Sequence, residues 1–147
     1  MSTSQATPQD AELILKLYDL RREAVMRQAR SFVVGFAPKS VDEILAVTNA
    51  FGGKENAYLR QVFGYWEMVA ALVVHGTLNA LLVFDTCQEM YFVYGKIQPF
   101  LEEFRQKTGM LDFLANLQKV VEGSAEGRER LARVQKRQAE MAAAAAR

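Results

Sequence analysis

The sequence predicts an all-α domain, a bundle of five to seven helices around a central antiparallel helical hairpin. Apolar residues recur every three or four positions along most of the chain, which is the spacing of one helix face. The densest apolar stretch, residues 63–105, is interrupted by His75-Gly76-Thr77, as expected where two buried helices turn back on each other. Only three prolines and nine glycines occur, so disorder is not expected outside the chain ends.

Length and composition narrow the possible functions. The 147 residues suit a single domain, and 50% hydrophobic with 24% charged residues is the usual balance of a globular protein. A net charge of +1 is too small for a general electrostatic footprint on nucleic acid, so we expect no nucleic-acid partner. Cys87 is the only cysteine, which fits a reducing compartment. The first ten residues lack the basic and apolar regions of a secretory signal, so we predict a cytoplasmic location.

The chain divides into a helical core domain over residues 1–123 and a polar, Ala-rich C-terminal helix or tail over residues 124–147. Residues 1–7 are expected to be a disordered lead. Thr7-Pro8 then provides a cap and a first-turn proline for the first helix. Two neighbouring apolar stripes continue this helix without a break to residues 35–38. Four arginines fall largely between the stripes, as on a solvated face: Arg21, Arg22, Arg27 and Arg30.

A short helix and a long helix follow. Ser40-Val41-Asp42-Glu43 is a capping-box sequence, and it opens a short helix that Gly52-Gly53 ends. The next helix runs from about residue 55 to residue 75, where Gly76 suits the left-handed conformation that closes many helices. This long helix is the first arm of the predicted hairpin, which spans residues 55–94 and forms the core.

The second arm of the hairpin runs from about residue 78 to residue 94. Gly95 and Pro99 either kink this helix or end it, so residues 78–107 form one kinked helix or two. The uncharged run over residues 68–84 is just below the usual span length of roughly 17–25 residues, and polar residues interrupt its centre. We therefore predict a buried hairpin and no membrane span.

Two amphipathic helices complete the chain. Leu111, Leu114, Leu117 and Val121 form one apolar stripe at helical spacing. Ser124 then begins a polar helix whose apolar residues form a heptad seam, too short to predict a coiled coil.

Few residues could carry chemistry. His75 is the only histidine, which excludes a di-metal bundle site with two Glu-x-x-His motifs and leaves no familiar zinc spacing. Cys87 lies roughly 10 Å or more from His75 along the expected hairpin, too far for a nucleophile–base pair. Phosphate-loop, nucleophile-elbow and dinucleotide motifs are absent. We therefore predict no catalytic residue, no metal site and no cofactor.

Glu67 and Glu89 are the remaining candidates, because they lie at about the same level of the expected hairpin. If both faced the seam, burial and mutual repulsion would raise the pKa of at least one carboxyl, as in acid–base sites. The favoured alternative is structural, with Glu67 pointing outward or paired with a cation. The cations considered for this pair are Arg60, Lys96 and Arg105.

The chain resembles a bacterial family catalogued only as a domain of unknown function, the 4760 family of that catalogue. Three segments carry the resemblance: LYDLRREAVMRQAR, AYLRQVFGYWEMVAALVVHG and QEMYFVYGKIQPFLEEFR. The resemblance covers roughly residues 14 to 122, and its most specific parts are Tyr65-Trp66-Glu67, His75-Gly76, and Pro99-Phe100 with Arg105. It implies a small helical bacterial domain and transfers no catalytic role.

We expect a non-catalytic helical interaction or regulatory module that self-associates, because no catalytic constellation passes a geometric check. The aromatic content and the projecting tail helix favour an oligomer. The alternative is a small-ligand-binding or enzymatic helical domain. Its ligand or seam residues would be Tyr65, Trp66, Glu67, His75, Glu89 and Arg105.

Overall fold

Local capping signals set most of the helix ends in the computed structural model, which describes residues 4–147. Thr7 forms a capping box with Asp10, and Ser40 accepts a hydrogen bond from the Glu43 amide, as the sequence predicts. Gly76 and Gly109 close helices with φ values of 73° and 72°, in the left-handed region that glycine adopts without strain.

The described residues form nine α-helices and one short 3-10 turn, so the all-α prediction is confirmed and the helix count exceeds five to seven. The elements are α1 (Pro8–Leu20), α2 (Ala24–Gly35), α3 (Val41–Thr48), α4 (Lys54–Val74), α5 (Ala80–Thr86), α6 (Gln88–Ile97), η1 (Gln98–Phe100), α7 (Leu101–Thr108), α8 (Ala115–Glu122) and α9 (Ala125–Ala145).

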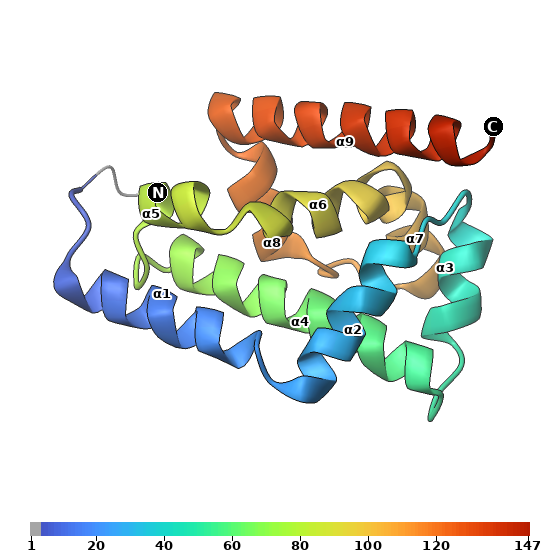
Figure 1. Ribbon diagram of the computed structural model, residues 1–147, viewed down its shortest axis with the longest axis horizontal. Helices are drawn as coiled ribbons and strands as arrows, with labels where there is room; N and C mark the ends of the chain where they lie inside the picture. Colours follow the sequence, from blue (N-terminus) through green and yellow to red (C-terminus); the bar gives the residue numbers. More distant parts are fainter. Residues whose placement is uncertain (1–3) are drawn as a thin grey trace.

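The prediction of one unbroken helix from Thr7-Pro8 to residues 35–38 is wrong, because the chain turns between α1 and α2. Glu23 occupies the N-cap of α2, and its carboxylate accepts hydrogen bonds from the amides of Val25 at 3.0 Å and Met26 at 2.8 Å. A carboxylate at this position satisfies amides that a continuous helix would bond to its own backbone. The turn sends α2 across α4, its main packing partner (Figure 1).

Residues 78–107, for which the sequence leaves one kinked helix or two, contain three separate α-helices. Cys87, with φ −113° and ψ 60°, interrupts the helical backbone between α5 and α6. Pro99 lies in η1, which connects α6 to α7. A proline has no amide hydrogen for the α-helical ladder, which explains the break there but not the break at Cys87.

Helix α4 passes through the middle of the fold, with α2 packed on it from one side and α8 from another (Figure 1). The predicted hairpin over residues 55–94 is not confirmed as the organising unit, since these two helices are the main partners of α4. The core still contains aromatic residues from both expected arms. Trp66, Tyr91 and Tyr94 are fully buried.

Helix α9, which the sequence presents as a polar helix or tail, lies along α6 (Figure 1). Gly95 permits the close approach, because a Cβ at this position would lie 3.1 Å from Gln138 Oε1 and 3.3 Å from Gln135 Cγ. Leu131 is buried, and Gln138 donates a hydrogen bond to the Phe92 carbonyl at 2.9 Å. The N-terminal part of α9 is therefore docked, whereas residues 139–147 are exposed.

Residues 1–3 of the predicted disordered lead lie outside the described residues. The Ser4 carbonyl accepts a hydrogen bond from Asn79 Nδ2 at 2.7 Å, which holds this end of the chain against the start of α5. Over residues 4–147, no helix has both the length and the apolar character needed to cross a membrane.

Candidate functional site

Glu89, a candidate site residue from the sequence, lies in a cluster of charged and aromatic side chains. Arg30 Nε lies 3.0 and 2.9 Å from the two carboxylate oxygens, and its Nη2 lies 2.5 Å from Oε2. Arg21 Nη2 donates to Oε2 at 3.1 Å, and Trp66 Nε1 donates to Oε1 at 3.4 Å. We call these four residues the Glu89 cluster. It joins α1, α2, α4 and α6 at the turn that precedes α2.

The Glu89 cluster holds its carboxylate in the ionised form. Burial raises the pKa of Glu89, but hydrogen bonds from Arg30 and the charges of Arg21 and Arg30 more than offset this effect, helped by Trp66. The net pKa of Glu89 therefore lies below its ordinary value. The hydrogen bond to Glu89 likewise raises the pKa of Arg30. A carboxylate whose pKa lies below its ordinary value is ionised at neutral pH, which makes it unsuited to proton transfer there.

Aromatic rings fix the Arg21 side chain. Its guanidinium carbon lies 5.3 Å from the centre of the Tyr18 ring and 5.2 Å from the Trp66 ring, within range of cation–π attraction. The neighbouring Tyr65 donates its hydroxyl hydrogen to the Leu17 carbonyl at 2.5 Å and packs edge-on against Trp66. Burial raises the pKa of the Tyr65 hydroxyl, so this residue is neutral and structural.

Glu67 has a different set of partners. Its Oε1 accepts from the backbone amide of Asn116 at 3.0 Å and from Asn116 Nδ2 at 2.9 Å. Its Oε2 accepts from the amide of Leu117 at 2.9 Å. Both amides belong to the first turn of α8, so Glu67 of α4 caps a helix distant in sequence. Leu114, the N-cap residue of α8, has a φ of 55° and supplies no side-chain cap of its own.

Arg105 fastens the other side of the same segment. Its Nε and Nη2 donate to the Phe113 carbonyl at 3.0 and 2.7 Å, and its Nη1 donates to Gln118 Oε1 at 2.9 Å. Arg105 is buried, so these bonds satisfy a charged group removed from water. We call Glu67 and Arg105 the α8 clamp, because together they hold the loop before α8 and its first turn.

The structure thus separates the two glutamates that the sequence places at one level. Each carboxylate has its own partners, so the geometry offers no shared acid–base seam. The cations proposed for Glu67 are also bonded elsewhere: Arg60 to Asn56 Oδ1, Lys96 to backbone carbonyls, and Arg105 to the loop before α8. Sequence reasoning weighed a shared seam, an outward position and a cationic partner for Glu67, and it did not consider a helix N-terminus, which supplies partners without a cation.

His75 stands apart from both groups. It is exposed at the C-cap of α4, where its backbone amide donates to the Ala71 carbonyl. Sequence reasoning also missed Arg21 and Arg30, which it assigned to a solvated face. Only the turn at Glu23 brings both arginines toward Glu89, and the N-cap carboxylate of Glu23 is the sequence feature that could have indicated this turn.

Within the described part of the chain, no group of three or more potential ligands among His, Cys, Asp and Glu could hold a metal ion.

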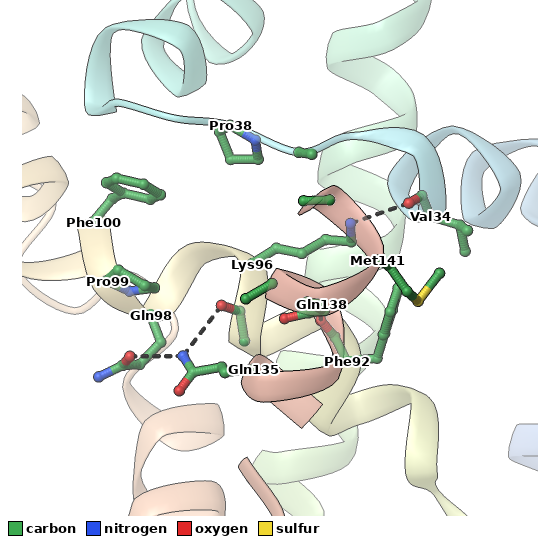
Figure 2. A pocket seen from close by; sticks show the side chains of 14 residues that line it. Val34, Pro38, Phe92, Lys96, Gln98, Pro99, Phe100, Gln135, Gln138 and Met141 are labelled. Carbon is green, nitrogen blue, oxygen red and sulfur yellow. Dashed lines mark hydrogen bonds between the residues drawn. The ribbon is translucent and has the colours of Figure 1, made fainter. Parts of the chain in front are cut away.

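A groove of about 660 Å³ lies between the C-terminal half of α9, the end of α6 with η1, and the segment that follows α2 (Figure 2). Its walls are mainly apolar, and none of the residues predicted from the sequence as site residues lines it. Lys96 is the lysine in this lining. It donates hydrogen bonds to the carbonyls of Val34 at 3.1 Å and Phe36 at 2.8 Å.

These features define a class of protein: an all-helical domain whose buried and half-buried polar side chains brace turns and helix ends, with an apolar groove on its surface. The chain belongs to the family described as Domain of unknown function (DUF4760), whose family model matches residues 6–124. The match includes the Glu89 cluster and the α8 clamp and ends just before α9. No curated protein and no solved structure matches the chain.

Proposed function

We propose that this protein is a non-catalytic helical interaction module that self-associates through the outer edge of α1. The non-catalytic part is supported by the bonding of the expected site residues. Glu67, Glu89 and Arg105 are all engaged in bonds that hold helices together, and His75 lies apart from them. Such engagement leaves none of them poised as an acid or base.

The self-associating part is supported by exposed apolar side chains on α1. Leu15 is 70% exposed, and Tyr18, one helical turn further, is 55% exposed. Leu20 at the end of α1 and Val25 at the start of α2 are also exposed. Helix α1 lies at the margin of the bundle (Figure 1), and the exposed fractions of these side chains place them at its surface. Exposed apolar clusters of this kind mark interaction sites, and a single patch that meets its own copy forms a closed dimer.

The proposal also covers the cellular location of the protein and its partners. A lone cysteine, a net charge of +1 and the family resemblance support a bacterial cytoplasmic protein without a nucleic-acid partner. The alternative of a ligand site around Trp66, Glu67 and Glu89 receives no support from the geometry, because the two carboxylates face different helices.

Sedimentation velocity over a range of concentrations tests self-association. We expect the wild-type chain to form a dimer or a larger oligomer, and Leu15→Glu to shift it to monomer by placing a charge in the interface. Phe51→Glu is the matched control, because Phe51 is 82% exposed in the turn before α4, away from α1. A wild-type chain that stays monomeric at every concentration contradicts the proposal. Equal effects of the two substitutions contradict the assignment to α1.

A further inference from the structure

We propose that the groove beside α9 is a binding site for a single-chain anionic amphiphile, with the anionic head on Lys96 and the hydrocarbon chain along the apolar walls. This inference is independent of self-association through α1, since the two surfaces share no residue. Neither the family match nor the sequence pattern assigns a ligand to this groove.

The size and lining of the groove suit a small apolar ligand. Its volume of about 660 Å³ falls within the roughly 300–1,000 Å³ typical of ligand sites, which are mostly apolar with a few placed polar groups. The walls come from three stretches of the chain, residues 34–38, 92–100 and 135–142, which meet only in the folded structure (Figure 2). The apolar lining residues are Val34, Ala37, Pro38, Phe92, Pro99, Phe100, Met141 and two alanines of α9.

Lys96 supplies a positive charge without a carboxylate partner. Among the ion pairs of residues 4–147, none includes Lys96. Its ammonium group lies 4.8 Å from the centre of the Phe92 ring and donates to two carbonyls at the end of α2. An ammonium group has three donors, so one remains for a ligand. Burial lowers the pKa of Lys96, and a bound anion would compensate the charge whose hydration is reduced there.

The other polar groups of the lining are already arranged by the fold. Gln135 Nε2 donates to the Gly95 carbonyl at 3.3 Å and to Gln98 Oε1 at 3.0 Å. Gln138 Nε2 donates to the Phe92 carbonyl. These bonds fasten the α9 wall of the groove, and they leave Lys96 as the charged group of the lining. One cation in an apolar groove complements a ligand with one anionic head and an uncharged chain.

Helix α9 forms one wall, although it lies outside the family match over residues 6–124. Ala139 and Ala142 line the groove from this helix, and their small side chains leave its volume open. A large side chain at Ala142 would occupy that volume without touching the core, because Ala142 is exposed. This position therefore offers a test that does not disturb the bonds of Lys96.

The test is a titration of the full chain with decanoate, kept below its micelle-forming concentration, followed by calorimetry and by the methyl resonances of the methionines. We expect saturable binding of one decanoate per chain, with a shift of the Met141 methyl resonance, which lies in the groove, and none of Met110, which does not line it. Decanol is the matched neutral ligand and should bind at least tenfold more weakly. Binding that does not saturate overturns the proposal, and equal affinity for decanol overturns the role of the anionic head.

Two pairs of variants locate the site. Ala142→Trp should abolish binding, whereas Ala143→Trp, one position away and outside the groove lining, should leave it unchanged. Lys96→Met should weaken decanoate binding at least tenfold and leave decanol unaffected, whereas Lys96→Arg should retain binding. Circular dichroism checks that each variant is folded. If Ala142→Trp binds decanoate like the wild-type chain, the groove is not the site, whatever the effect at Lys96.

Discussion

The Glu89 cluster and the α8 clamp use the same side chain in opposite ways. Glu89 is an ionised carboxylate between two arginines and an indole, so its contacts balance charge against charge. Glu67 accepts only from neutral groups, two backbone amides and one side-chain amide, at the positive end of a helix dipole. A half-buried glutamate therefore does not by itself indicate a catalytic site or a cationic partner. Its meaning depends on which helix end or side chain the fold brings to it.

The largest expected loss of stability comes from changing Glu89, the glutamate whose charge is balanced by two arginines. Glu89→Gln removes the negative charge and leaves Arg21 and Arg30 without a counter-ion in a largely buried setting. We expect a loss of about 3 kcal/mol in the free energy of unfolding, since breaking one partner of a buried ion pair is strongly destabilising. Urea denaturation measures this loss. The control is Glu129→Gln, which removes an exposed pair with Arg133 and should change stability by less than about 1 kcal/mol.

Low pH should remove the stabilisation that the ionised Glu89 carboxylate provides. The pKa of Glu89 is lower in the folded chain than its ordinary value, so its ionised form stabilises the fold above the unfolded pKa. This contribution is lost as the pH falls through the lowered folded pKa, because protonation then no longer distinguishes the two states. The difference in unfolding free energy between the wild-type chain and Glu89→Gln should therefore shrink on acidification below the ordinary carboxylate pKa. A difference that grows on acidification would contradict the ionised assignment.

A smaller loss is expected at the α8 clamp. Glu67→Gln keeps the length of the side chain but has one carbonyl oxygen in place of two carboxylate oxygens, and it removes the charge at the helix N-terminus. We expect a loss of about 1 kcal/mol, the usual contribution of a helix cap. Urea denaturation again gives the value. A loss as large as that of Glu89→Gln would mean that the capping carboxylate is as critical as the charge pair, and the contrast between the two glutamates would disappear.

The smallest effect should come from Asn116→Ala. This change deletes one hydrogen bond to Glu67 and leaves both backbone amides in place. We expect a loss of about 0.5–1 kcal/mol, the net value of one such bond. The loss should largely vanish when Glu67→Ala is already present, because that variant has no acceptor for the Asn116 side-chain amide. Additive losses in the double variant would show that Asn116 stabilises the protein by some other contact.

Helix formation was predictable where the sequence carried periodic apolar residues and local caps. Thr7, Ser40 and Gly76 act at short range, so their roles follow from the few residues around them. The helix breaks at Glu23 and Cys87 were missed because the local sequence does not mark them with a glycine, a proline or a change of apolar spacing. The apolar stripes of the first helix continue across the turn at Glu23, so periodicity alone favours one helix, and no glycine or proline marks the break at Cys87.

The residues singled out from the sequence were sound choices, but their roles were not deducible from it. Tyr65, Trp66, Glu67, Glu89 and Arg105 all make specific polar contacts in the fold. Their partners lie 8 to 68 positions away along the chain. The groove beside α9 was not expected at all, because its wall belongs to a helix that the sequence presents as a polar tail.

The sequence by itself determined the all-α class, the family and most helix caps, because these depend on apolar spacing and on contacts within one or two turns. The tertiary structure alone decided the partners of the two glutamates, the docking of α9 against Gly95 and the shape of the groove. These features depend on where turns direct whole helices. A residue at a turn sets a direction in space, and a linear pattern of apolar residues does not contain that direction.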